Sequence, residues 1–144
     1  MDNYLIDAVA EARKSLKTGG IPIGSVLIKD GKVIARGHNK RVQEENPMKH
    51  AEIDCLINAG RIGSYKNTIL YSTLMPCYLC AGAVVQFGIK KVVVGESRTF
   101  SGAEEFMKSH GVEVINLDDG ECVKMMTDFI AQNPKLWYED IGEL

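Results

Sequence analysis

The 144-residue sequence predicts an α/β fold, a three-layer α/β/α sandwich built around a mixed five-stranded sheet. Two short apolar runs flank Asp30-Gly31, a pair that is typical of the tight turn in an antiparallel hairpin. Three further apolar runs alternate with segments of helical periodicity, which is typical of parallel strands joined by crossover helices. A hairpin joined to such units predicts a sheet of mixed strand direction with helices on both faces.

The individual elements follow from apolar periodicity and from turn or capping residues. Strands are expected where short apolar runs are bounded by turn residues, at 25–28, 33–37, 68–73, 91–95 and 112–117. Helices are expected where apolar residues recur every three or four positions, at 2–17, 50–61, 77–87, 101–109 and in one last segment. Asp118 or Asp119 is a suitable N-cap for the last helix. This helix should stop before Asn133-Pro134, because a residue that precedes proline avoids helical geometry.

Helical spacing also predicts which side chains the helices bury. The predicted inward faces comprise Leu5, Val9, Ala12 and Leu16 in the first helix, Ile53, Leu56 and Ile57 in the second, and Cys122, Met125, Met126, Phe129 and Ile130 in the last. Cys55 and Cys122 are therefore interpreted as small buried apolar residues rather than as reactive thiols.

Composition narrows the class of protein. Apolar residues make up 45% and charged residues 25% of the chain, which is ordinary for a single domain spanning 1–144. The net charge of −2, with no dense Lys/Arg block, argues against tight nucleic-acid binding, since that depends on neutralising phosphates. No apolar run approaches the ~20 residues that a membrane span needs. Four cysteines without a secretory signal favour reduced thiols and a cytoplasmic location.

Two cysteines three residues apart follow a proline at the end of a predicted strand. Pro76 fits the first helical position, where its missing N–H costs nothing, so Cys77 and Cys80 should lie in the first turn and just beyond it. The positive end of a helix favours thiolates, which are the form that binds metals. The pair alone leaves four possibilities open: a redox dithiol, a structural metal clip, a catalytic metal site and plain packing.

A histidine and a glutamate begin an earlier predicted helix. His50 and Glu52 are two residues apart, so they diverge beside the helix but can converge on a target beyond its N-terminal end. His50, Cys77 and Cys80 then supply three zinc ligands and leave a fourth position for water, as in catalytic zinc sites. Zinc lowers the pKa of its water to ~7, and Glu52 can take that proton and return it to a leaving amine. Taken singly, "HAE" would indicate only the start of a helix.

The place of Cys77 and Cys80 in the sequence disfavours two rival interpretations, a redox dithiol and a closed structural zinc site. A redox motif is expected after the first long strand, whereas this pair follows a later strand. A closed zinc clip needs another cysteine pair or a nearby histidine, and neither His38 nor His110 has ligand spacing. His38 is expected to end a strand and His110 to lie in a turn. A noncatalytic zinc-binding interaction domain is the rival from a different functional class.

Three other segments are candidate pocket walls. Asn39 has an amide that can pair with an amide-like ligand edge, although most asparagines at strand ends only cap turns. "TGGIPIG" at 18–24 either ends a helix or lets backbone approach a flat ligand. The C-terminal segment 134–144 carries the only tryptophan. This segment either docks one aromatic side chain on the domain or forms a lid, in which Trp137 closes the pocket and Asp140 reaches an amine.

These motifs resemble those of the cytidine-deaminase-like superfamily. Its zinc deaminase signature, H-x-E followed by P-C-x-x-C, stands here as "HAE" at 50–52 and "PCYLC" at 76–80. Over nearly its whole length the chain is similar to the fungal-type cytosine deaminases. The similar segments are "GGIPIG" (19–24), "GHN" (37–39), "HAEI" (50–53), "LYSTLMPCYLCAGAVV" (70–85), "VVGES" (93–97) and "WYEDIGE" (137–143). The C-terminal segment is the most specific of these, because many deaminases share the zinc motif.

The resemblance implies an activity and a set of site residues. The fungal-type enzymes convert cytosine to uracil and ammonia in cytoplasmic pyrimidine salvage, as homodimers with one catalytic Zn²⁺ per subunit. By this resemblance His50, Cys77 and Cys80 would bind zinc, and Glu52 would move the proton. The implied substrate contacts are Asn39 and the N–H of Ala51 on the carbonyl side of the base, Asp140 and the carbonyl of Met75 at its amine, and Phe100, Trp137 and Ile23 around its ring.

Two positions depart from the family pattern. Ala51 replaces the usual Gly between the histidine and the glutamate, and Met75 replaces the usual Ser before the proline. Both positions act mainly through backbone, so the chemistry should be retained, but the larger side chains can shift the pocket toward another amino-substituted ring. A guanine deaminase and then a tRNA wobble-adenosine deaminase are the alternatives within this chemistry. The net charge and a tail suited to closing over a free base disfavour the tRNA enzyme.

Overall fold

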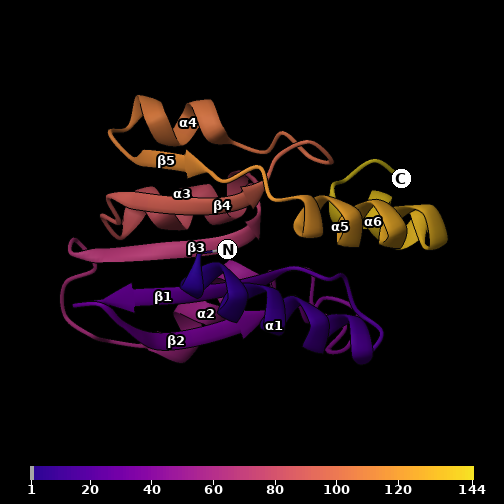
Figure 1. Cartoon of the computed structure of the whole chain (residues 1–144), viewed down its shortest axis with the longest axis horizontal. Helices are drawn as coiled ribbons and strands as arrows, with labels where there is room; N and C mark the ends of the chain where they lie inside the picture. Colours follow the sequence, from indigo (N-terminus) through magenta and orange to yellow (C-terminus); the bar gives the residue numbers. More distant parts are fainter. Residues whose placement is uncertain (1) are drawn as a thin grey trace.

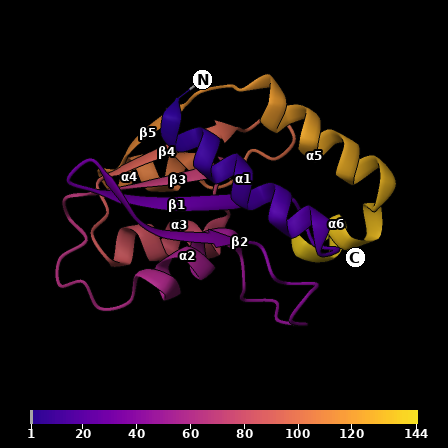
Figure 2. The same ribbon diagram turned by 60° about the horizontal axis from the view of Figure 1, so that its bottom comes forward.

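The computed structural model describes residues 2–144 and contains a five-stranded sheet with helices on both faces (Figure 1 and Figure 2). The strands are β1 (Gly24–Lys29), β2 (Lys32–His38), β3 (Thr68–Leu74), β4 (Lys91–Glu96) and β5 (Glu113–Asn116). The helices are α1 (Asn3–Lys17), α2 (Ala51–Ala59), α3 (Tyr78–Gln86), α4 (Glu104–Ser109), α5 (Gly120–Gln132) and α6 (Pro134–Asp140). The predicted α/β sandwich with a mixed five-stranded sheet is confirmed.

The sheet combines one hairpin with a parallel part. Its strand order is β2-β1-β3-β4-β5, with β1 antiparallel to both neighbours and β3, β4 and β5 parallel to one another. The hairpin turn is the predicted one, since Asp30 and Gly31 have φ values of 51° and 72°, as a type I′ turn requires. The end of β2, the start of β1 and the ends of β3 and β4 therefore lie at one edge of the sheet, where ligands bind in such folds.

Side chains that alternate along the strands build a separate core on each face of the sheet. On one face Leu27, Leu70 and Val92 pack with buried residues of α2, α3 and α4. On the other face Val26 and Tyr71 pack with buried residues of α1 and α5. Since neighbouring strand residues point to opposite faces, each strand contributes to both cores. Figure 2 shows α1 and α5 on the face opposite α2 and α3.

A third cluster of buried residues lies beyond the edge of the sheet. It joins the start of β1, the first residue of α2, the end of β3, α5 and α6, through Ile21, Ile23, Ala51, Leu74, Met126, Phe129 and Trp137. This cluster attaches the C-terminal helix to the edge at which the loops after β2, β3 and β4 converge.

Two of the predicted inward side chains are exposed instead. Leu16 is 43% exposed, because α1 buries a face shifted toward Ala8 and Ser15. Ile57 is 58% exposed, because it lies on the side of α2 turned away from the sheet. The apolar character of α2 therefore extends beyond the face that this chain covers. Cys55, also on α2, is fully buried, as predicted.

Two helix boundaries also differ from expectation. Helix α3 begins at Tyr78 with Cys77 as its N-cap, so Pro76 precedes the helix rather than opening it. The helix α5 stops before Asn133-Pro134 as predicted, but Pro134 opens the short helix α6, which the apolar pattern did not indicate. Of the two candidate N-caps for α5, Asp119 is the one used, and its carboxylate accepts the N–H of Cys122.

Within residues 2–144, no helix has both the length and the apolar character required to cross a bilayer.

The close contact between β2 and α2 leads to a stability prediction. A Cβ on Gly37 would lie 2.7 Å from Cα of Cys55 and 2.8 Å from the carbonyl oxygen of Ala51, both on the backbone of α2. Gly37→Ala should therefore lower the free energy of unfolding by about 2 kcal/mol or more, as measured by urea denaturation. Gly120→Ala is the matched control, because a Cβ at Gly120 meets nothing within 4 Å. Equal stabilities for the two variants would contradict the close packing of β2 on α2.

Candidate metal centre and pocket

The N-terminal ends of α2 and α3 face each other beyond the edge of the sheet. His50 is the N-cap of α2 and Cys77 is the N-cap of α3, and both have extended backbone geometry. Neither side chain makes a capping hydrogen bond to its own helix. Both side chains are therefore free to point beyond the helix end rather than along the helix side. The predicted convergence of the two ends is confirmed, although His50 and Cys77 lie one position before their helices rather than inside them.

His50, Cys77 and Cys80 form a group of potential metal ligands. Their ligand atoms all lie within 4.8 Å of one another, and Nδ1 of His50 is 3.4 Å from Sγ of Cys77. At ordinary zinc–sulfur and zinc–nitrogen bond lengths, the ligands of a tetrahedral ion are roughly 3.5–3.8 Å apart. The three donors thus fit a Zn²⁺ ion, and their imidazole and thiolate chemistry is the kind that zinc prefers.

The protonation of the two thiols also suits metal binding. A hydrogen bond with Cys80 lowers the pKa of Cys77 to about 4, against the opposing effect of burial. The same contact, together with burial, raises the pKa of Cys80 well above its usual value. Cys77 therefore favours the thiolate form and Cys80 the thiol form, and a zinc ion bound here would require both sulfurs as thiolates. Burial lowers the pKa of His50, but the contact with Cys77 and the charge of Asp140 outweigh it and raise that pKa to about 9.

Glu52 supplies a buried carboxylate beside the three ligands. Its side chain lies in the first turn of α2 and is 4% exposed. Burial, together with the charge on Cys77, raises the pKa of Glu52 to about 7, against the opposing charge of His50. A carboxyl group with a pKa near neutrality can both accept and donate a proton at physiological pH, which is what general acid–base catalysis requires. Its position therefore suits the proton-transfer role that the sequence predicts.

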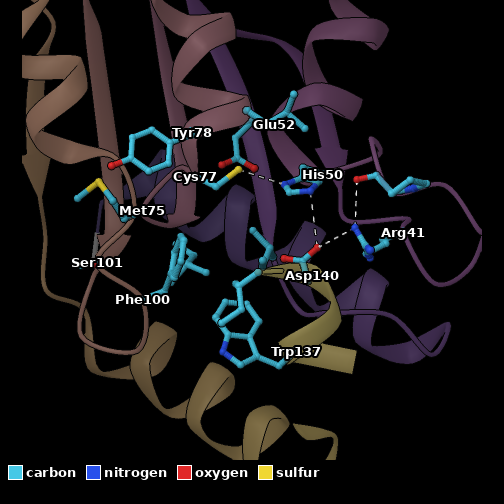
Figure 3. A pocket seen from close by; sticks show the side chains of 16 residues that line it. Arg41, His50, Glu52, Met75, Cys77, Tyr78, Phe100, Ser101, Trp137 and Asp140 are labelled. Atoms are coloured by element: carbon cyan, nitrogen blue, oxygen red, sulfur yellow. Dashed lines mark hydrogen bonds and ion pairs between the residues drawn. The ribbon is translucent and has the colours of Figure 1, made fainter. Parts of the chain in front are cut away.

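A pocket of about 540 Å³ opens in front of these residues (Figure 3). Its lining includes His50, Glu52 and Cys77 on one side and residues of α6 on another. Among the predicted substrate contacts, five line this pocket: Ile23, Met75, Phe100, Trp137 and Asp140. The remaining two, Asn39 and Ala51, are fully buried behind its wall.

Asn39 combines a structural role with one unused donor. Its Oδ1 accepts the backbone N–H of Arg41 at 3.0 Å, which is the turn-capping contact that most such asparagines make. Its Nδ2 is buried without a hydrogen-bond partner among the described residues. A buried, unpartnered amide donor is costly, so this group is a candidate for binding a ligand acceptor. Ala51 is the first residue of α2, where the backbone N–H has no partner within the helix.

Two of the three glycines of 18–24 make room for protein rather than for a ligand. A Cβ on Gly20 would overlap the side chain of Gln43, and a Cβ on Gly24 would overlap the backbone of α1 at Ala8 and Ala12. The interpretation in which these glycines let backbone approach a flat ligand is therefore wrong for Gly20 and Gly24. Only Ile23 of this segment lines the pocket.

The C-terminal helix α6 forms one wall of the pocket. Trp137 is 4% exposed and meets Phe100 edge-to-face, with ring centroids 5.6 Å apart. Oδ1 of Asp140, at the end of α6, lies 3.6 Å from Nε2 of His50 and has no hydrogen-bond partner among the described residues. Burial raises the pKa of Asp140. The tail thus brings an aromatic ring and a carboxylate to the ligand cluster, whereas its movement as a lid stays a prediction.

Two residues that shape the site were not among the predicted site residues, although one of them, Glu96, lies in the family-like segment "VVGES". Arg41 lines the pocket and lies 3.8 Å from Asp140. Glu96 is fully buried at the end of β4, where its carboxylate accepts the N–H groups of Arg98 and Thr99 and holds the loop that carries Phe100. A lone arginine in a loop or a glutamate at the end of a strand has many ordinary explanations, so only the fold identifies their roles.

Comparisons with known proteins agree with this geometry. Residues 1–96 match the family model described as the cytidine and deoxycytidylate deaminase zinc-binding region. The cytosine deaminase of Candida albicans is 46% identical over 139 residues, covering 94% of this chain and 93% of that protein. The tRNA-specific adenosine deaminase of Bacillus subtilis is 35% identical over 141 residues, covering 90% of this chain and 88% of that one. A solved tRNA:A34 deaminase superposes with a TM-score of 0.78 at 28% identity, covering 87% of this chain and 99% of that one.

The ligand assignment predicts how zinc content depends on single cysteines. Cys77→Ala should lower the zinc content of the purified protein to about a tenth of the wild-type value or less, because two ligands hold the ion weakly. Cys122→Ala is the matched control, since Cys122 is a buried cysteine on α5, on the opposite face of the sheet. Elemental analysis of the purified proteins measures both. Full zinc content in Cys77→Ala would contradict the assignment.

Proposed function

The chain belongs to the cytidine and deoxycytidylate deaminase family of zinc-dependent deaminases, and we propose that it deaminates a free nucleobase, with cytosine as its substrate. The observation that carries the choice of substrate is the 46% identity to the Candida albicans cytosine deaminase across nearly the full length of both chains. The tRNA-specific relatives reach 35% identity over a similar length. The proposal covers residues 1–144 as one deaminase domain with 134–144 as its lid.

The pocket geometry supports a small planar substrate. Phe100 and Trp137 present aromatic surface, and Ile23 and Met75 present aliphatic surface, to the space in front of the ligand cluster. Because α6 covers one side of this space, the pocket fits a free base better than a base that remains attached to a polynucleotide. The net charge of −2 also favours a substrate without phosphates.

The chain's residues divide the proposed reaction between them. Water adds to the ring carbon that bears the amine, the carbon–nitrogen bond breaks, and the products are uracil and ammonia. When bound by His50, Cys77 and Cys80, zinc supplies a Lewis acid that makes water nucleophilic at neutral pH. Glu52 takes the proton from the attacking water and delivers it to the leaving amine, a role that suits its pKa of about 7.

The remaining contacts orient the base. The free Nδ2 of Asn39 and the N–H of Ala51 would donate to the ring carbonyl, on the side of α2. Asp140 and the backbone carbonyl of Met75 would accept from the exocyclic amine. Since the carbonyl and the amine stand on different carbons of the cytosine ring, separated by one ring nitrogen, donors at one wall and acceptors at the other would select one orientation. The Ala51 and Met75 side chains are where the pocket differs from the family pattern, so a guanine or other amino-substituted ring is the second candidate.

We further propose that the protein acts as a homodimer in cytoplasmic pyrimidine salvage. The dimer is supported by an apolar groove between α2 and α3 that this chain leaves uncovered. Ile57 and Phe87 line this groove and are 58% and 50% exposed. Such exposed apolar side chains on one face are typical of protein–protein interfaces. The salvage role follows from the proposed substrate, and the four free cysteines support the cytoplasmic location.

The substrate proposal is tested by measuring ammonia release from a panel of cytosine, guanine, adenine, cytidine and tRNA. We expect turnover of cytosine well above that of the other compounds. Glu52→Gln should retain zinc but lose turnover by about 100-fold or more, because it lacks the proton-transfer group. Preferred turnover of guanine or tRNA would overturn the substrate proposal, and zinc binding without turnover of any amine would indicate the noncatalytic interaction domain.

The dimer proposal is tested by sedimentation velocity. The wild-type protein should sediment as a dimer, and Ile57→Asp should sediment as a monomer, because a carboxylate in the groove opposes burial. Ile6→Asp is the control, since Ile6 is 49% exposed on α1, on the other side of the molecule. A monomeric wild type, or equal dissociation in both variants, would refute the α2–α3 interface.

A further inference from the structure

Arg41 belongs to the loop after β2, and its side chain extends from this loop toward the C-terminal helix α6. Its Nη1 donates to the carbonyl oxygen of Pro47 at 3.2 Å, and the same nitrogen lies 3.8 Å from Oδ1 of Asp140. Its Nη2 lies 3.6 Å from Oε1 of Glu139. The side chains of Arg41 and Asp140 are 16% and 6% exposed, so these two meet largely away from solvent, whereas Glu139 is 50% exposed. One guanidinium therefore reaches the loop and two consecutive carboxylates of α6.

The last turn of α6 has few other polar attachments. Within residues 2–144, the only lysine or arginine that ion-pairs with α6 is Arg41, and the only other polar partner of Asp140 is His50. The rest of the attachment is apolar, through Leu136, Trp137 and Ile141 in the third core cluster. A cation near the C-terminal end of a helix also interacts favourably with the helix dipole. Arg41 is thus the group that ties the acidic end of α6 to the body of the domain.

Arg41 also lines two cavities. It lines the pocket in front of the ligand cluster, and it lines a second cavity of about 340 Å³ between the loop 42–47 and α6. Figure 3 shows its guanidinium beside Asp140, on the side of that carboxylate away from Trp137. Loss of the guanidinium would remove part of the wall of both cavities and would leave His50 as the only polar partner of Asp140 within residues 2–144.

We infer that Arg41 is a positioning residue that latches α6 over the pocket and so presents Asp140 to the exocyclic amine of the substrate. This inference rests on the proposed function and deepens it, because it assigns the closure of the substrate wall to one side chain. The two charge contacts are longer than hydrogen bonds, at 3.6 and 3.8 Å, and within residues 2–144 neither Nε of Arg41 nor Oδ1 of Asp140 has a hydrogen-bond partner. The contact of Arg41 with Glu139 and Asp140 is therefore electrostatic. Substitution of Arg41 removes it without removing a hydrogen bond within α6.

The fork shape of arginine matters for this role. A guanidinium directs several N–H groups in one plane, so it can reach Pro47, Glu139 and Asp140 together. A lysine ammonium is a single point charge on a flexible stem and cannot bridge all three. Arg41→Lys should therefore retain only part of the attachment of α6 that Arg41→Met loses. If Arg41 acted only by placing one positive charge in the pocket, Arg41→Lys would behave like the wild type.

Trp137 provides a direct readout of the latch, because it is the only tryptophan in the chain and lies buried on α6. In Arg41→Met, acrylamide should quench the Trp137 fluorescence more strongly than in the wild type, since α6 undocks more often. The KM for the base should rise by about tenfold, with a smaller change in kcat and an unchanged zinc content. Arg41→Lys should be intermediate in both quenching and KM.

Arg36→Met is the matched control, because Arg36 on β2 forms a more exposed ion pair with Asp7, on α1. It should leave quenching and KM at their wild-type values. Unchanged quenching in Arg41→Met would overturn the latch. If KM rose without a change in quenching, Arg41 would contact the substrate directly, and if KM also stayed the same, Arg41 would have no role in the pocket. Far-UV circular dichroism establishes that each variant is folded. If the wild type turns over no base, the proposed function fails while the quenching comparison still decides the latch.

Discussion

The meeting of two helix N-termini is the constraint on which the rest of this structure depends. α2 and α3 follow different parts of the sheet, yet both begin at the same edge, and each is preceded by a ligand residue with extended backbone. The partial positive charge at both helix ends favours thiolate on the cysteines. Because His50 and Cys77 stand before their helices, their side chains reach one point that lies outside both. The sheet register and the close contact of β2 with α2 fix that point.

The site has two halves that are held in different ways. The ligand half is carried by helix ends whose positions follow from two packed cores on either face of the sheet. The substrate half is assembled from the loop held by Glu96, the end of β3 and the short helix α6, which meet in the third cluster. Packed elements fix positions more firmly than loops and chain ends do. The metal half should therefore be formed before substrate arrives, whereas the substrate wall depends on how firmly α6 is attached.

The sequence indicates the secondary-structure elements and the zinc-ligating residues strongly, but it indicates contacts between distant segments only weakly. Asp30-Gly31 and the pair Asp118-Asp119 act through local backbone chemistry, so they predict the hairpin directly and limit the α5 cap to two candidates, of which Asp119 is used. The order of histidine, glutamate and paired cysteines predicts the ligand group because so few residue types bind zinc. By contrast, the exposure of Ile57 depends on what lies outside α2, and the importance of Arg41 depends on where a distant tail docks. Such facts arise only when the whole chain is folded.

The central claim is that one zinc ion lies between the two helix ends with three protein ligands and one position open to solvent. X-ray absorption spectroscopy at the zinc edge of the purified protein tests this claim most directly. The account predicts a first shell of two sulfurs, one imidazole nitrogen and one exchangeable oxygen. A shell completed by a fourth protein side chain, or one that lacks the imidazole, would contradict it.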